Sequence, residues 1–232
     1  MNKAVIFANG QSPFFEDFSL EKDKYNKFLQ NLKKDVSQSD IVIACDGAIK
    51  YIEEENSFIP DYIVGDLDSI DFRNLNLDIQ KKYLAKLIRI SDQDTNDLTK
   101  AVNFAISKNV KQIVIYGATG KREDHSLANI ALLLEYACQL DSVVMKSQYG
   151  TFYPVKKSLT CKTAPNCQIS IFSIDKNVRI TSKNLAWELH NTKLPALWMG
   201  SLNRTLKNRF TIQTNSSKAY VLVWLELKAN LF

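Results

Sequence analysis

The sequence predicts an α/β fold in which a parallel sheet with helices on both faces is followed by an antiparallel β-sandwich. Two observations lead to this prediction. Through the first two-thirds of the chain, short apolar segments typical of strands alternate with amphipathic segments typical of helices. After about Gln148 the helical periodicity stops, and short segments alternate apolar and polar residues between turn-rich pieces.

Six apolar segments in the first two-thirds have the length and composition of buried strands. They are Ala4–Ala8, Ile41–Ala44, Tyr62–Val64, Leu87–Ile90, Gln112–Tyr116 and Ser142–Lys146. The clearest helix face is formed by residues at the spacing i, i+3, i+4, i+7 and i+8: Leu98, Ala101, Val102, Ala105 and Ile106. Strands that alternate with helices form βαβ units, which place the strands parallel in one covered sheet. We therefore expect a Rossmann-like N-terminal domain.

The last third of the chain contains strand signals of another kind. Gln168–Phe172 and Phe210–Thr214 alternate apolar and polar residues, and Tyr220–Leu225 is a more continuous apolar run. These segments predict an antiparallel pair of sheets. We place the domain boundary near residues 147–151, so that the domains comprise residues 1–148 and 149–232.

Length, charge and hydropathy limit the class of protein. The 232 residues, 45% of them hydrophobic, suffice for one large domain or two modest ones. A net charge of +5 with scattered lysines is weak evidence for nucleic acid and is compatible with a polyphosphate substrate. No segment resembles a membrane-spanning helix or a secretory signal, so we expect a cytoplasmic protein without nucleic-acid or membrane partners.

Four cysteines are present: Cys45, Cys138, Cys161 and Cys167. None belongs to a CxxC pair, and no spacing with histidine suits zinc. We expect buried free thiols, although Cys161 and Cys167 could form a bridge in an oxidising compartment. Trp187 and Trp224 are expected in the core, where tryptophan is more often found than in ligand contacts.

Polar groups follow each of the first five predicted strands. In chain order they are Asn9-Gly10, Asp46-Gly47, Asp66 with Asp68, Asp92 with Asp94 and Asp97, and the loop that starts at Gly117. The carboxyl ends of parallel strands meet at one edge of a sheet, where ligands bind in open α/β folds. This shared position, more than any single residue, indicates a functional site.

Each acidic segment also has a structural interpretation. Residues 65–69 could be a turn with a helix cap, or they could bring two carboxylates together on a metal ion. Asp94 is a good N-cap for the helix that follows, and Asp97 could complete a capping box. Arg122 could pair with Asp124 on the surface, although phosphate contact is favoured beside a glycine-bearing loop.

The segment Gly117-Ala118-Thr119-Gly120-Lys121-Arg122-Glu123-Asp124-His125 crosses from a predicted strand to a predicted helix. Glycine allows close backbone approach, arginine binds phosphate, and paired aspartates hold Mg²⁺. The segment does not match the P-loop, and no G-x-G-x-x-G follows the first strand. No nucleophile elbow supports a Ser-His-Asp system. The residues thus suggest an enzyme that acts on a nucleotide polyphosphate.

Four segments, taken together and in this order, resemble the thiamine pyrophosphokinase (thiamine diphosphokinase) family. They are Asp46-Gly47, G-D-x-D-S at 65–69, D-Q-D-x-x-D at 92–97 with Thr99-Lys100, and G-A-T-G-x-R-x-D-H at 117–125. In the last third, the segments 184–189 and 200–203 are similar to the family's G-L-x-W-x-L and G-x-S-N. The resemblance covers most of the chain.

The resemblance implies a homodimer with sites shared between subunits, in which pyrophosphate passes from Mg-ATP to the hydroxyl of thiamine. Metal and pyrophosphate positioning are implied for Asp66, Asp68 and Asp97, with Asp46 and Asp94 in support. Nucleotide contacts are implied for Gly47, Gln93, Lys100, Gly117, Ala118, Thr119, Gly120, Arg122 and Asp124. Thiamine contacts are implied for Trp187, Ser201 and Asn203, because aromatic faces suit a cationic thiazolium ring.

The chain departs from the family pattern at four positions: Ala48, Asn96, Lys121 and Leu202. The first three lie on the nucleotide side, while Leu202 replaces a serine that usually precedes the asparagine.

Two other functions remain open. A pyrophosphokinase acting on another alcohol, such as a pterin, would need the same acids and a different pocket. A nucleotide or thiamine sensor without turnover would not need so many carboxylates.

Overall fold

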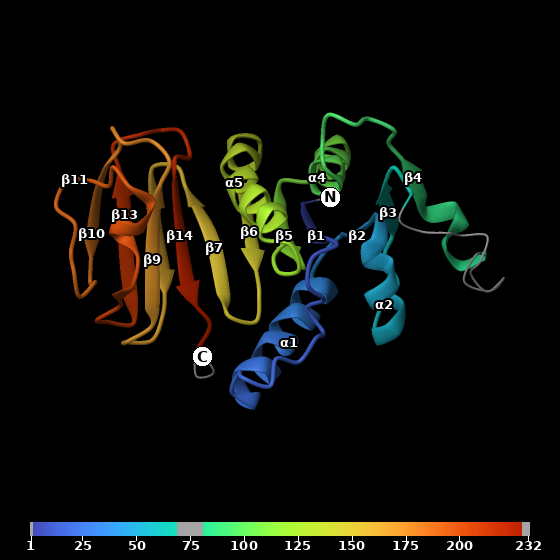
Figure 1. The fold of residues 1–232 in the computed structure, drawn as a ribbon, viewed down its shortest axis with the longest axis horizontal. Helices are drawn as coiled ribbons and strands as arrows, with labels where there is room; N and C mark the ends of the chain where they lie inside the picture. Colours follow the sequence, from blue (N-terminus) through green and yellow to red (C-terminus); the bar gives the residue numbers. More distant parts are fainter. Residues whose placement is uncertain (1, 69–80, 229–232) are drawn as a thin grey trace. The chain divides into compact units, whose positions relative to one another are not determined.

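The computed structural model describes residues 2–68 and 81–228, and Ser69 of the G-D-x-D-S segment lies outside them (Figure 1). The chain divides into two compact units. Unit 1 comprises Met1–Asp17, Leu29–Ile130 and Leu140–Ser142, and unit 2 comprises Phe18–Phe28, Ala131–Gln139 and Val143–Phe232. Helices α1 (Lys22–Ser37) and α5 (Glu123–Gln139) contribute residues to both units.

Unit 1 contains a parallel sheet with the strand order β5-β1-β2-β3-β4. The strands are β1 (Lys3–Phe7), β2 (Ile41–Cys45), β3 (Tyr62–Gly65), β4 (Leu87–Arg89) and β5 (Gln112–Tyr116). Ile6 of the central strand pairs with Ile43 on one side and Ile115 on the other. All five agree with the predicted strands to within one residue at each end, because continuous apolar runs are typical of buried parallel strands.

The described parts of the connections in unit 1 contain helical segments, as βαβ units require. They include α2 (Ile49–Glu55), α4 (Asp97–Ser107) and two 3₁₀ segments, η1 (Asp46–Ala48) and η3 (Leu84–Lys86). The predicted apolar face of α4 is buried at Leu98, Ala101, Val102 and Ala105. This α/β architecture confirms the predicted fold class for unit 1.

The N-cap of α4 differs from the prediction. Asn96, two residues beyond Asp94, occupies the cap, and its side chain accepts a 2.9 Å hydrogen bond from the backbone N–H of Thr99. Asp94 is exposed, and its backbone N–H donates to Oδ1 of Asp92. Both residue types cap helices well, so the sequence could not distinguish them.

Unit 2 is built from antiparallel strands. One sheet has the order β12-β9-β14-β7-β6, with β6 (Ser142–Lys146), β7 (Gly150–Val155), β9 (Gln168–Ser173), β12 (Asn203–Arg204) and β14 (Val221–Glu226). The other has the order β11-β10-β13-β8, with β8 (Ser158–Lys162), β10 (Arg179–Lys183), β11 (Thr192–Lys193) and β13 (Arg209–Thr214). A further 3₁₀ segment, η4, spans Leu197–Gly200.

The two sheets of unit 2 share one hydrophobic core. Ile169 and Ile171 of β9 and Val223 of β14 pack in the same cluster as Ile180 of β10 and Phe210 of β13. Alternating side chains from two facing sheets define a β-sandwich, as predicted. Strands β8 and β10 carried weaker signals, because Thr, Ser and Lys occupy many of their positions, and β7 contains a glycine and a proline, which are uncommon in strands.

The cysteines are free thiols, as expected, but burial is not general: Cys45 and Cys167 are buried, Cys161 is partly buried, and Cys138 is exposed. Trp187 also departs from expectation, because 58% of its surface is exposed. No helix in the described parts of the chain has the length and apolar character needed to cross a bilayer.

Candidate functional site

The acidic residues of unit 1 gather at the carboxyl edge of the parallel sheet. Asp46 follows β2 directly and begins η1, Asp66 follows β3 directly, and Asp97 is the first residue of α4. Because β2 and β3 are parallel neighbours, their ends bring Asp46 and Asp66 together. The start of α4 then adds Asp97, so three segments that are distant in sequence meet at one point.

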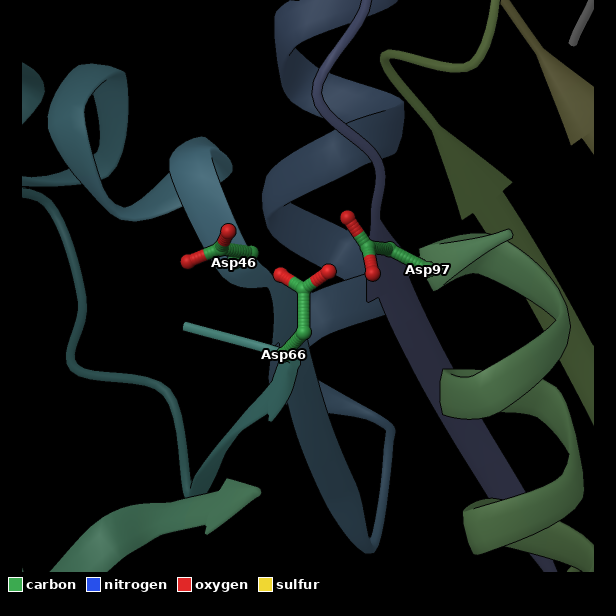
Figure 2. A group of neighbouring side chains, drawn as sticks. All are labelled: Asp46, Asp66 and Asp97. Atoms are coloured by element: carbon green, nitrogen blue, oxygen red, sulfur yellow. The ribbon is translucent and has the colours of Figure 1, made fainter. Parts of the chain in front are cut away.

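Asp46, Asp66 and Asp97 each offer a carboxylate oxygen, and these three oxygens lie within 4.8 Å of one another. Figure 2 shows the three side chains beside one another, with the carboxylate of Asp97 directed toward that of Asp66. Asp68 is exposed and lies outside this group of three, although its backbone N–H donates to Oδ1 of Asp66 at 3.3 Å. A set of three carboxylates fits a hard divalent cation such as Mg²⁺. The role of Asp68 as a metal ligand stays a prediction.

Lys100 supplies positive charge to this acidic group. Its Nζ atom lies 3.3 Å from Oδ1 of Asp97 and 3.9 Å from Oδ2 of Asp66, and its side chain is only 4% exposed. Burial raises the pKa of Asp97, and the bond from Lys100 opposes that rise. The hydrogen bond from the Asp68 backbone lowers the pKa of Asp66. The cation on Lys100 therefore favours the ionised form of both carboxylates.

Two glycines allow the acids to approach one another. A Cβ atom on Gly65 would stand 2.7 Å from the Cβ of Asp46 and 3.4 Å from Oδ1 of Asp97. A Cβ atom on Gly47 would overlap the side-chain amide of Asn9. Any other residue at either position would force these groups apart, since real Cβ contacts do not come this close.

The loop at residues 117–120 packs against the segment that follows β1. The backbone N–H groups of Gly10 and Gln11 donate to the carbonyls of Gly117 and Thr119 at 2.6 and 2.8 Å. Gly117 and Gly120 have φ angles of 65° and 81°, which glycine adopts without strain. A Cβ atom on Gly120 would stand 2.5 Å from Cβ of Gln11. These glycines are thus required by the packing of two loops, and backbone contact with a nucleotide stays a prediction.

Arg122 forms a two-point ion pair with Asp124. Its Nε and Nη2 atoms donate to the two carboxylate oxygens at 3.1 and 2.6 Å. Both side chains are largely exposed, at 71% and 63%. The bond from Arg122 holds the pKa of Asp124 at about 2. The surface ion pair predicted as one alternative is therefore present, and phosphate contact by Arg122 stays a prediction.

A pocket of about 390 Å³ connects the acids with the glycine loop. The predicted site residues that line it are Asp66, Gln93, Asp97, Lys100, Ala118, Gly120 and Arg122. The sequence assigns no role in the site to seven other lining residues, although it places Asn9, Asn96 and Lys121 on this side of the sheet: Asn9, Cys45, Thr95, Asn96, Lys121, His125 and Asn129. The predicted site residues of unit 1 that do not line it are Asp46, Gly47, Asp68, Asp94, Gly117, Thr119 and Asp124. The pocket therefore combines carboxylates, cations and amides, the groups that a metal–polyphosphate complex requires.

Asn129 is one of the missed residues with a clear structural role. Its Oδ1 accepts a 3.0 Å bond from Nδ2 of Asn96, and its own Nδ2 donates to the carbonyl of Ala118 at 2.8 Å. These two bonds connect the start of α4 with the glycine loop. The signal in the sequence was the asparagine three residues into the helical pattern after Ser126, an unusual amide in a largely apolar segment.

A larger hollow, of about 690 Å³, lies in unit 2 and is lined by Lys162, Pro165, Asn184, Lys207, Asn208 and Arg209. It contains no carboxylate that could hold a divalent cation. Its size therefore does not make it the better candidate for the chemistry, and the smaller pocket at the sheet edge remains the candidate site.

The predicted thiamine contacts lie in unit 2 and are connected to one another. Asn203 is buried, its Nδ2 donates to the carbonyl of Trp187 at 2.7 Å, and its Oδ1 accepts from the backbone N–H of Trp187 at 3.1 Å. The guanidinium carbon of Arg204 lies 5.6 Å from the centre of the Trp187 ring. Asn203 thus fixes the backbone of Trp187 while the indole stays exposed. Direct contact of either residue with a ligand stays a prediction.

Ser201 and Leu202 precede this asparagine. The hydroxyl of Ser201 donates to the carbonyl of Trp198 at 2.7 Å. Leu202 has a φ of 60° and is 75% exposed, an uncommon state for a branched apolar residue. The side chain that replaces the family's serine therefore points to solvent, and Ser201 uses its own hydroxyl within the segment.

Comparison with known protein families agrees with this geometry. Residues 32–145 match the model described as thiamin pyrophosphokinase, catalytic domain, and residues 150–224 match thiamin pyrophosphokinase, substrate-binding domain. The chain belongs to the thiamin pyrophosphokinase family. The acids, Lys100 and the glycine loop all fall within the first match, and Trp187 and Asn203 fall within the second.

Two curated members of the family show the extent of the sequence likeness. The chain is 30% identical over 111 residues to thiamin pyrophosphokinase 1 of Caenorhabditis elegans, which covers 44% of this chain and 43% of that protein. It is 27% identical over 182 residues to thiamine pyrophosphokinase 2 of Arabidopsis thaliana, which covers 73% of this chain and 66% of that protein. The matches therefore span less than two-thirds of either relative.

Solved structures of the thiamin pyrophosphokinase family share the fold over the whole chain. The Bacillus subtilis thiamine pyrophosphokinase superposes with a TM-score of 0.74 at 20% identity, covering 99% of this chain and all of that one. Yeast thiamin pyrophosphokinase gives a TM-score of 0.70 at 16% identity, covering 99% and 87%. At these identities the likeness establishes the fold.

Proposed function

We propose that the protein catalyses the transfer of pyrophosphate from ATP to the hydroxyl of thiamine, giving thiamine diphosphate and AMP. The observation that carries the proposal is the group of Asp46, Asp66 and Asp97, two of which, Asp66 and Asp97, pair with Lys100 and line with it a pocket that also reaches the glycine loop. Phosphoryl-type transfer needs positioning and charge neutralisation more than covalent help from the protein. Membership of the thiamin pyrophosphokinase family supports this substrate pair.

In the proposed reaction the thiamine oxygen attacks the β-phosphorus of ATP, and the bond from that phosphorus to the oxygen bridging the α-phosphate breaks. The hydroxyl proton passes to solvent, and AMP leaves with the bridging oxygen. Mg²⁺ would neutralise the charge on the phosphate oxygens when it is bound. Asp66 and Asp97, with Asp46 beside them, would hold that ion, and Lys100 would keep their carboxylates ionised.

Other residues of unit 1 would position the nucleotide. Arg122 would leave Asp124 and bind phosphate oxygens with both donors of its guanidinium. Gln93 lines the same pocket and would contact the phosphates. The exposed positions of Asp68 and Asp94 suit residues that are recruited by the metal–nucleotide complex. The backbone of Gly47 and that of the loop from Gly117 to Gly120 would contact the metal–nucleotide complex.

We further propose a homodimer in which residues 1–148 supply the nucleotide site and residues 149–232 bind thiamine and form the dimer. In support, the region around the thiamine candidates has several exposed apolar side chains: Trp187, Leu197, Trp198, Met199 and Leu202. Exposed apolar groups gathered in one region are typical of interaction surfaces.

The free thiols and the requirement for ATP support a cytoplasmic location.

The experiment that tests the activity is an assay of AMP release from Mg-ATP with thiamine, with a pterin alcohol, and with no acceptor. We expect AMP and thiamine diphosphate in equal amounts with thiamine only. Product formed only with the pterin alcohol would identify a different pyrophosphokinase. Binding of ATP and thiamine without AMP in any of the three reactions would identify a sensor.

A further inference from the structure

Backbone conformations with positive φ point to residues that the mechanism has not yet used. Among the described residues, eight non-glycine residues have positive φ, and five of these are asparagines, which tolerate that region. The other three are Leu67, Lys121 and Leu202. Each lies between two residues that the sequence assigned to the site. Strain of this kind persists only where the surroundings enforce it, and it gathers at functional sites.

Lys121 is the charged member of these three. Its φ is 59°, a region in which the Cβ of an L-residue crowds the following carbonyl. A glycine at this position would have no Cβ and no such strain. Lys121 lines the pocket, and its Nζ lies 3.4 Å from the backbone carbonyl of Asn9.

The charges that line the pocket show what Lys121 could bind. Lys100 is paired with Asp97 and Asp66, and Arg122 is paired with Asp124. Lys121 also lines the pocket, and within the described parts of the chain it forms no ion pair with a carboxylate. Its one polar contact there is a neutral carbonyl at long distance. Lys121 is thus a pocket cation whose charge is not already neutralised by the protein.

From these observations we propose that Lys121 is a polyphosphate-binding residue, held at the pocket by a strained backbone conformation. This inference rests on the proposed function in one respect, namely that the pocket receives a polyphosphate chain. It predicts a conflict between stability and binding at a single residue: the substitution that relieves the strain also removes the charge. A solvated lysine on a loop would show no such conflict.

The test compares four variants by isothermal titration with Mg²⁺ and inorganic tripolyphosphate, then with Mg-ATP, and by thermal unfolding without ligand. Lys121→Ala removes the charge and keeps the Cβ, whereas Lys121→Gly removes both. Lys111→Ala is the charge control, because Lys111 is exposed in unit 1 and does not line the pocket. Asn109→Gly is the backbone control, because Asn109 has a φ of 64° and lies outside the pocket.

We expect both Lys121 variants to bind tripolyphosphate and Mg-ATP about tenfold more weakly, the loss of one charge-assisted contact. Of the two Lys121 variants, only Lys121→Gly should also have a melting temperature about 2–4 °C above that of the wild type, because it removes the Cβ. Neither control should change tripolyphosphate binding. Unchanged binding by Lys121→Ala, or a wild type that binds no polyphosphate, would overturn the inference. If the wild type binds tripolyphosphate through Lys121 and yet forms no thiamine diphosphate, the inference stands and the proposed activity fails.

Discussion

Gly65 lies so close to Asp46 that a Cβ atom on the glycine would stand 2.7 Å from the Cβ of the aspartate. Gly65 ends β3 and Asp46 follows the neighbouring parallel strand β2, so their contact sets how near the carboxylates of Asp46 and Asp66 can come. The arrangement of the three carboxylates therefore depends on the absence of a Cβ atom at Gly65 as well as on the aspartates themselves.

Gly65→Ala is expected to destabilise unit 1 and to abolish most activity. Overpacking of this kind costs about 1–3 kcal/mol in unfolding free energy, measured by chemical denaturation. The double variant Gly65→Ala/Asp46→Gly removes the opposing Cβ, so it should recover most of the stability without recovering activity. Asp46→Gly alone supplies the reference for this cycle. Additive losses in the double variant would show that the two residues do not oppose each other.

Asp66→Asn and Asp97→Asn should each lower turnover by about 10²-fold, the effect of losing one electrostatic contact in the transition state. Both should fold normally, and neither should gain thermal stability from Mg²⁺. Because burial raises the pKa of Asp97, protons compete with Mg²⁺ there at higher pH than at an ordinary aspartate. Stabilisation by Mg²⁺ should therefore weaken as the pH falls toward that raised pKa.

Asp141→Asn is the matched control for these variants, since Asp141 is exposed in unit 1 and does not line the pocket. It should keep wild-type turnover and Mg²⁺ stabilisation. Near-wild-type turnover of both Asp66→Asn and Asp97→Asn at saturating Mg²⁺ would exclude the assigned role of the acid group.

Arg122→Lys should raise the KM for ATP and leave thiamine binding largely intact. A lysine carries the charge but cannot reproduce the two-point grip that Arg122 makes on Asp124. The melting temperature should hardly change, because exposed ion pairs contribute little to stability. A lowered melting temperature with an unchanged KM for ATP would instead assign Arg122 a structural role.

Mixed dimers test the shared site. Trp187→Ala should mainly impair the use of thiamine, and Asp97→Asn should mainly impair the transfer step. When the two inactive homodimers exchange subunits, each mixed dimer has one site free of both substitutions. About half the dimers are then mixed, so roughly a quarter of wild-type activity should return. No recovery after demonstrated exchange would place each site within a single chain.

Thiol labelling at pH 8 should show one fast cysteine, Cys138, which is exposed. Burial raises the pKa of Cys45 well above its usual value, with Asp97 and Asp46 adding to the shift, and burial raises the pKa of Cys161 to about 11. Both thiols therefore stay protonated and unreactive at pH 8. Cys138→Ser should remove the fast phase, and all four thiols should react in denaturant. A second fast thiol in the native protein would contradict this assignment.

The sequence by itself determined the parallel sheet and the edge at which the site lies. Apolar runs such as Gln112–Tyr116 identify buried strands locally, and alternation with helices requires those strands to be parallel. Once they are parallel, the residues that follow them must share one edge, so Asp46, Asp66, Asp68 and Asp97 could be placed at that edge before any distance was known. The order of the motifs also identified the family.

Only the tertiary structure decided which of these side chains meet. Asp46 lies in one group with Asp66 and Asp97, whereas the family resemblance implied a supporting role for Asp46 and the role of a metal ligand for Asp68, which stays a prediction. The positive φ of Lys121 and the pairing of Arg122 with Asp124 likewise depend on loop packing. Sequence patterns report periodicity along one segment, whereas these contacts are set by the distances between segments that lie far apart in the chain.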